Sequence, residues 1–152
     1  MYQPKIKVFY TPKMVVKQKI GISNCIRKSQ IFMQFLEKES ILERHFTVEG
    51  DFEPLSKEDL LLCHRSDYIN EFYSGELKNI GTSTLKWSKD YANTLLYCGS
   101  SIYHAIKHAI EDQSQICHSP VNNFNKAMPW CGIGASAFAL HTVASLKIFQ
   151  EY

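Results

Sequence analysis

Residues 60–75 read LLLCHRSDYINEFYSG and are the most informative part of the chain. Ser56 lies just upstream and is followed by two acidic residues, so we expect it to cap a helix whose first turn suits the helix dipole. Within the stretch, Ser66 is expected to cap a second helix over residues 67–73. Gly75 ends that helix, because glycine adopts the left-handed conformation of a C-terminal cap without strain.

The rest of the chain alternates strand-like runs with helical periodicities. Short apolar and aromatic runs predict strands at residues 6–10, 46–48 and 116–117. Apolar residues at three- and four-residue steps predict helices at residues 25–39, 88–110 and 135–149. Gly99 lies inside the longest helix, where it costs about 1 kcal/mol relative to alanine but permits close packing. The order of elements favours an α/β fold with a parallel sheet, in a single domain over residues 1–152.

Composition and charge exclude several classes of protein. The 152 residues include 17 basic and 15 acidic side chains, a balance that does not favour nucleic-acid binding. No apolar run approaches about 18 residues, so no membrane-spanning helix is expected, and the amino terminus does not resemble a signal peptide. The five cysteines are widely spaced and form no C-x-x-C motif. We therefore expect a cytoplasmic protein with reduced thiols and with neither a nucleic acid nor a membrane as partner.

Two local patterns have both a functional and a structural interpretation. Residues 132–137 fit G-x-G-x-x-A, but no clear strand precedes them and no acidic residue follows about 20 residues later. A glycine turn into a packed helix is favoured, and a small binding domain with an anion site near Gly132–Ser136 is the alternative. His104 and His108 are spaced as in helical zinc sites, but the glutamate of H-E-x-x-H is Ala105 here, so a surface or half-buried pair is favoured.

The stretch 60–75 closely resembles the histone deacetylase segment ELLxVHxxxYVxxFxxG, with His64, Tyr68, Phe72 and Gly75 in register. The likeness extends over roughly residues 5–145, the first half or less of a typical domain of that family. The chain thus resembles the N-terminal half of a histone deacetylase or acetylpolyamine amidohydrolase. That resemblance implies the arginase–deacetylase fold, a three-layer α/β/α arrangement around a parallel sheet.

The resemblance also places altered residues at the family's catalytic positions. In the family, a zinc-bound water attacks the acetyl-lysine carbonyl, and paired histidines in a segment like PVSGFHHA act as acid and base. Residues 120–127 read PVNNFNKA, so Asn125 and Lys126 stand where the histidines belong. An asparagine amide cannot accept a proton near neutral pH, and the lysine adds a positive charge beside the zinc position.

The family segment GFCxFN reads GASAFA at residues 134–139, with Ala135 in place of the phenylalanine of the substrate tunnel. The resemblance therefore implies a vestigial pocket loop made of Pro120, Phe124, Gly134, Ser136 and Phe138. The family's zinc ligands belong to a later Asp-x-His segment that these residues do not contain. We expect no metal ligand and no cofactor in this chain.

These observations favour a non-catalytic, deacetylase-like domain or fragment with a binding or structural role. We expect another chain or self-association to complete it, because an incomplete sheet leaves an unpaired edge and a bare apolar face. The alternative is the N-terminal piece of a zinc-dependent deacetylase that acts on acetylated lysine or polyamine. Even then, activity of this chain alone is not expected.

Overall fold

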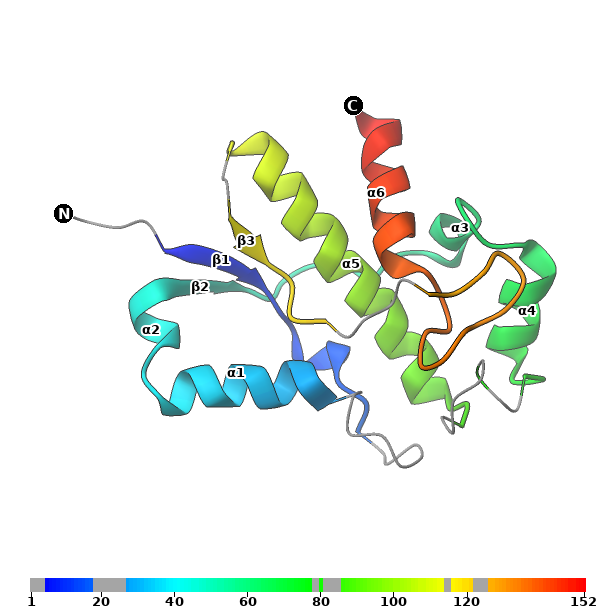
Figure 1. The fold of residues 1–152 in the computed structure, drawn as a ribbon, viewed down its shortest axis with the longest axis horizontal. Helices are drawn as coiled ribbons and strands as arrows, with labels where there is room; N and C mark the ends of the chain where they lie inside the picture. The colour runs from blue at the N-terminus through cyan, green and yellow to red at the C-terminus, as the bar shows by residue number, and fades with distance from the viewer. Residues whose placement is uncertain (1–4, 18–26, 78–79, 81–85, 114–115, 122–125) are drawn as a thin grey trace.

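The computed structural model describes residues 5–17, 27–77, 80, 86–113, 116–121 and 126–152 (Figure 1). One parallel sheet has the strand order β2-β1-β3, with β1 at Ile6–Phe9, β2 at Phe46–Glu49 and β3 at Cys117–His118. The helices are α1 Lys28–Lys38, α2 Leu42–His45, α3 Lys57–Leu60, α4 Ser66–Ser74, α5 Lys89–Glu111 and α6 Leu140–Glu151, and a 3-10 helix, η1, spans Pro12–Met14. The predicted parallel sheet is confirmed. The sequence pattern did not predict α2.

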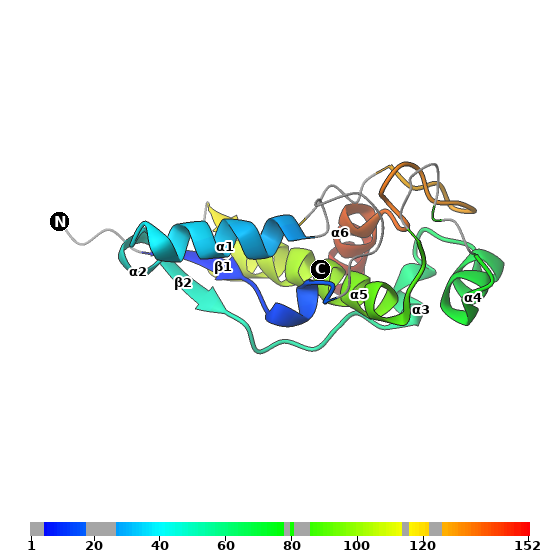
Figure 2. The ribbon, with the colours of Figure 1, turned by 90° about the horizontal axis from the view of Figure 1, so that it is seen from below.

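Alternate strand residues face two different helical layers, as the pleat of a sheet requires. On one face, the ring of His118 lies 5.2 Å from the ring of Phe32 on α1. On the other, the ring of Phe9 lies 5.7 Å from that of His108 on α5. Figures 1 and 2 show α1 and α5 on opposite faces of the sheet. The described residues thus form the expected three-layer arrangement.

The segment around α3 and α4 follows its sequence signals closely. Ser56 Oγ accepts a 3.1 Å hydrogen bond from the Asp59 N–H, and the Asp59 carboxylate accepts one of 2.8 Å from the Ser56 N–H. These two bonds form a capping box and confirm Ser56 as the cap. Ser66 is not a cap, because α4 already begins there and Arg65 is the residue before it. Gly75 ends α4 with a φ of +82°.

The hydrophobic core lies among α4, α5 and α6. Its largest fully buried side chains include Phe72, Tyr91, Leu95, Phe138 and Val143. Helix α5 runs through the middle of the molecule and packs on both the sheet and α6 (Figure 1). A Cβ at Gly99 would lie 2.6 Å from Leu55 Cδ1 and 3.4 Å from Leu140 Cδ2. This glycine therefore permits the close packing expected from its place in the helix.

The last helix begins at Leu140, so the prediction that it starts at Ala135 is wrong. The reason is a tight turn in which Ile133 and Ser136 exchange backbone hydrogen bonds of 3.0 Å. Gly134 has a φ of +61° in this turn, which a continuous helix does not allow. The glycine turn consequently does not lie at a helix N-terminus, as the alternative anion site would require.

The helix predicted at residues 25–39 is present as α1, while residues 25 and 26 lie outside the described residues. Among the described residues, none of the helices combines the length and apolarity needed to cross a lipid bilayer.

Candidate functional site

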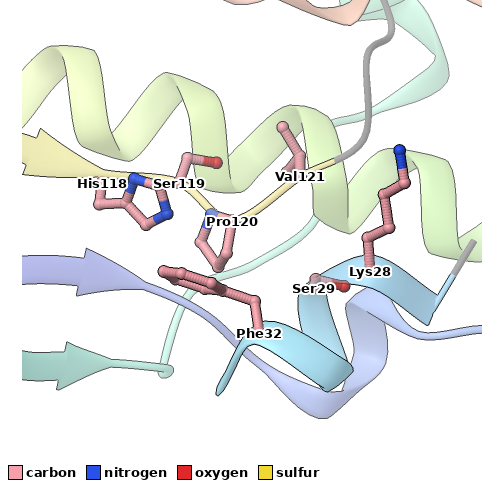
Figure 3. Close-up of a pocket in the computed structure, with 7 residues that line it drawn as sticks. All are labelled: Lys28, Ser29, Phe32, His118, Ser119, Pro120 and Val121. Carbon is pink, nitrogen blue, oxygen red and sulfur yellow. The ribbon is translucent and has the colours of Figure 1, made fainter. Parts of the chain in front are cut away.

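A pocket of about 180 Å³ opens where the chain leaves β3 (Figure 3). The carboxyl ends of parallel strands are the usual ligand-binding edge of an α/β sheet. Residues at the start of α1 and residues just after β3 line the pocket: Lys28, Ser29, Phe32, His118, Ser119, Pro120 and Val121. No sequence pattern indicates a role for His118, because only the fold brings it next to α1.

The pocket has an apolar wall and a cationic rim. Phe32 and Pro120 lie against each other in Figure 3, and Lys28 stands at the opposite side. The Ser119 hydroxyl turns away toward α5, where its Oγ lies 2.6 Å from the Ser101 Oγ. Burial lowers the pKa of His118, which favours its neutral form. No acidic side chain is among the described residues that line this pocket.

The positions that the resemblance aligns with the family's catalytic histidines follow this pocket in the sequence. Pro120 is buried in its wall. Phe124 and Asn125 lie outside the described residues, so their predicted roles stay predictions. Lys126 is exposed at the start of a well-defined loop. Residues 126–139, which we call the anchored segment, run from Lys126 to the beginning of α6.

Three buried side chains fasten the anchored segment to the core. The Tyr68 hydroxyl donates to the Ala137 carbonyl at 2.7 Å, and the Tyr91 hydroxyl to the Ala135 carbonyl at 3.2 Å. His64 is hydrogen-bonded near both ends of the segment, to Met128 and to Ala139. The conspicuous residues of the 60–75 motif are therefore in contact with the loop that would carry the catalytic groups.

His64 is in a defined neutral tautomer. The Ala139 N–H donates to Nε2 at 3.0 Å, so Nε2 holds a lone pair and the ring proton lies on Nδ1. Nδ1 then donates to the Met128 carbonyl at 3.1 Å. Burial lowers the pKa of His64, against the opposing effect of its backbone hydrogen bonds. With both nitrogens engaged, this imidazole positions the main chain and has no nitrogen left for a substrate or a metal.

The other residues of the expected pocket loop lie apart from the pocket. Phe138 is fully buried, with its ring 4.8 Å from that of Phe72 and 5.5 Å from that of Tyr68. Ser136 is 2% exposed, and Gly134 occupies the tight turn. Only Pro120 of the described members lines the pocket. The loop predicted from the resemblance is thus divided between the pocket wall and the core.

The histidine pair on α5 lines a second, more polar cavity of about 260 Å³. His108 Nδ1 lies 2.8 Å from the Asp112 carboxylate, while burial lowers the pKa of His104. In the part of the chain that the structure describes, no three histidine, cysteine or acidic side chains are placed to hold a metal ion.

The four described cysteines, Cys63, Cys98, Cys117 and Cys131, are free thiols. Burial raises the pKa of Cys63 to about 11 and that of Cys98 to about 12. Both therefore remain protonated and unreactive near neutral pH.

Comparison with solved structures identifies the fold. The chain superimposes on the crystal structure of the HDA15 HD domain, a histone deacetylase domain, with a TM-score of 0.78 at 11% sequence identity. The match covers 97% of this chain and 44% of that chain, so this chain spans less than half the length of its structural neighbour. No family model and no curated protein sequence matches this chain. The likeness establishes the α/β fold of a deacetylase domain.

Proposed function

We propose that this chain is a non-catalytic, deacetylase-like module with a binding or structural role, completed by another polypeptide or by a second copy. The observation that carries the proposal is the incomplete sheet. Among the described strands, β3 pairs with β1 alone and forms one edge of the sheet. The structural neighbour extends well beyond the matched 44% of its own chain. An open parallel edge is a template for a further strand.

Exposed apolar side chains support the same proposal. Three of them lie near the ends of α5 and α6, where Ile110 is 44%, Phe149 81% and Tyr152 67% exposed. The Tyr152 hydroxyl is bonded to Glu111 at 2.8 Å, which ties the two helix ends together. Covering such side chains yields roughly 25 cal/mol for each Å² of apolar surface removed from water.

The chemistry of two positions supports a non-catalytic role. The resemblance places Asn125 and Lys126 where the family has its acid and base, and neither side chain can take up a proton from a bound water near neutral pH. His64, the histidine of the 60–75 motif, is engaged by the backbone through both nitrogens. We propose in addition that the chain lies in the cytoplasm, a location that the four described free thiols support.

Sedimentation velocity over a range of protein concentrations, together with binding of a hydrophobic dye, tests the proposal. We expect concentration-dependent association, or strong dye binding that falls when Phe149 is replaced by glutamate. A well-behaved monomer that binds no dye would contradict it. In a parallel assay, the chain with added zinc is expected not to deacetylate an acetyl-lysine peptide.

The second candidate is the N-terminal piece of a zinc-dependent amidohydrolase acting on acetylated lysine or polyamine. The match to a histone deacetylase domain favours it. Zinc-dependent hydrolysis in a full-length context that includes the family's Asp-x-His segment would support this candidate over the first. In the same context, hydrolysis that appears only in the N125H/K126H variant would support our assignment of those two positions.

A further inference from the structure

The side chain of His64, just before α4, is hydrogen-bonded to the anchored segment near both of its ends. Only 4% of its surface is exposed. Its ring packs against Phe138 and Tyr68, with centroid distances of 5.1 and 6.0 Å. Its two hydrogen bonds reach Met128 near the beginning of the segment and Ala139 at its end. The imidazole therefore fixes where the segment leaves the core and where it enters α6.

A second proton is incompatible with this arrangement. In the imidazolium form both ring nitrogens are donors, and Nε2–H would point at the Ala139 N–H from 3.0 Å away. Two donors in contact repel each other, and His64 is buried at this point. The Ala139 N–H would also lose its acceptor, which is unfavourable for a buried donor.

We propose that His64 is a pH-sensitive latch, and that protonation of its imidazole releases the anchored segment from the core. Release begins at Ala139, where the bond to Nε2 is lost, and frees the turn around Gly134 and the Phe138 ring to move. The segment carries Lys126 at its other end, so opening also moves the position that the resemblance aligns with a catalytic histidine. The latch operates whether the chain is a binding module or part of an enzyme.

The surroundings of His64 contain no group that would stabilise the charged ring. Tyr68 on α4 packs against the ring, Cys63 precedes it in the chain, and Cys131 and His141 lie close in sequence to its hydrogen-bond partners Met128 and Ala139. The packed elements also carry titratable or charged side chains that do not contribute to the pKa of His64: Asp67, Glu71 and Tyr73 on α4, Lys147 and Glu151 on α6, and Lys126 in the anchored segment. Burial keeps Cys63 and Tyr68 protonated by raising the pKa of each. The nearest ion pair along the chain joins Arg65 to Asp67, and both side chains are exposed to solvent. Among the described residues, no charged group contributes to the pKa of His64.

Amide hydrogen exchange tests the latch through the protection factor of the Ala139 N–H, which removes the intrinsic pH dependence of exchange. Opening lets the imidazole return to its ordinary pKa of about 6.5. The pKa of His64 is lower in the closed state than in the open state, so opening takes up one proton. The protection factor of the Ala139 N–H should therefore fall up to tenfold per pH unit below about pH 6.5. Above that pH it should be constant.

Two variants make the result specific. His64→Gln supplies a donor for Met128 and an acceptor for Ala139 without titrating, so its protection factor should not depend on pH. His45→Gln replaces an exposed histidine on α2 and should keep the wild-type slope. Equal pH dependence in His64→Gln and wild type, or a flat profile in wild type, would overturn the proposal.

A direct measurement covers the case in which His64→Gln does not fold. Nitrogen NMR of the wild-type imidazole should show a protonated Nδ1 and an unprotonated Nε2 at pH 7.5. The midpoint at which Nε2 gains its proton should lie below the pH at which protection of the Ala139 N–H begins to fall, because the pKa of His64 is lowered in the closed state. Protonation of His64 without loss of protection at Ala139 would refute the latch. It would leave the proposed function unaffected, because that proposal depends on association and hydrolysis measurements.

Discussion

Replacing Gly99 by alanine measures how tightly α5 packs against its neighbours. In a free helix the substitution stabilises by about 1 kcal/mol, because alanine has less backbone entropy to lose. Here the new methyl group would lie 2.6 Å from Leu55 Cδ1 and 3.4 Å from Leu140 Cδ2. Such overpacking costs about 1–3 kcal/mol. The difference predicts a net loss of about 0–2 kcal/mol in the free energy of unfolding.

A double-mutant cycle separates the two contributions. Leu55→Val removes the atom that the new methyl group meets, at a cost of about 1 kcal/mol for the lost methylene. In that background Gly99→Ala should become neutral or stabilising, which gives a coupling energy of about 1 kcal/mol or more. Urea unfolding followed by far-UV circular dichroism provides all four free energies. An identical effect of Gly99→Ala in both backgrounds would show that Leu55 does not limit the space at Gly99.

Three further predictions follow from single contacts. Tyr68→Phe removes the donor to the Ala137 carbonyl and should lower the unfolding free energy by about 1–3 kcal/mol in urea titrations, and a loss below the error of the method would contradict this bond. Gly75→Ala places a side chain on a residue with a φ of +82°, next to the ring of Trp87. The variant should lose about 1–2 kcal/mol of unfolding free energy, measured as a lower melting temperature. Burial alone would raise the pKa of the Asp59 carboxyl, but the hydrogen bond and charge of Lys147 hold that pKa below its ordinary value. The free energy of unfolding should therefore decrease as the pH falls below about 4. Lys147→Met should reduce this acid loss in unfolding measurements from pH 6 to 3, and an unchanged profile would exclude the ion pair as its cause.

The elements that the sequence predicted well are those with local signals. Helix α4 ends at Gly75 because a left-handed residue stops a helix wherever it occurs. The capping box at Ser56 is likewise contained within four consecutive residues. The error at Ala135 arose because apolar periodicity continues through the turn at Gly134, whose positive φ the pattern does not reveal.

The candidate site was harder to predict, because its contacts join distant parts of the chain. The pocket forms only when Phe32 on α1 meets His118 at the end of β3. The resemblance drew attention to His64, but its role depends on Met128 and Ala139, which lie 64 and 75 positions away. Helical or strand periodicity carries no information on such pairings. The fold class was predictable, whereas the use of each polar group was not.

The order of the strands has a consequence for how the protein is made. The central strand β1 leaves the ribosome well before its partner β3, which lies beyond the long helix α5. At about 5–20 residues per second, one side of β1 waits several seconds for its neighbour. During that time the nascent chain presents bare backbone groups beside Val8 and Phe9, which are buried once the chain has folded. Until β3 has been synthesised, that side of β1 is therefore an unpaired strand edge, which can pair with other chains.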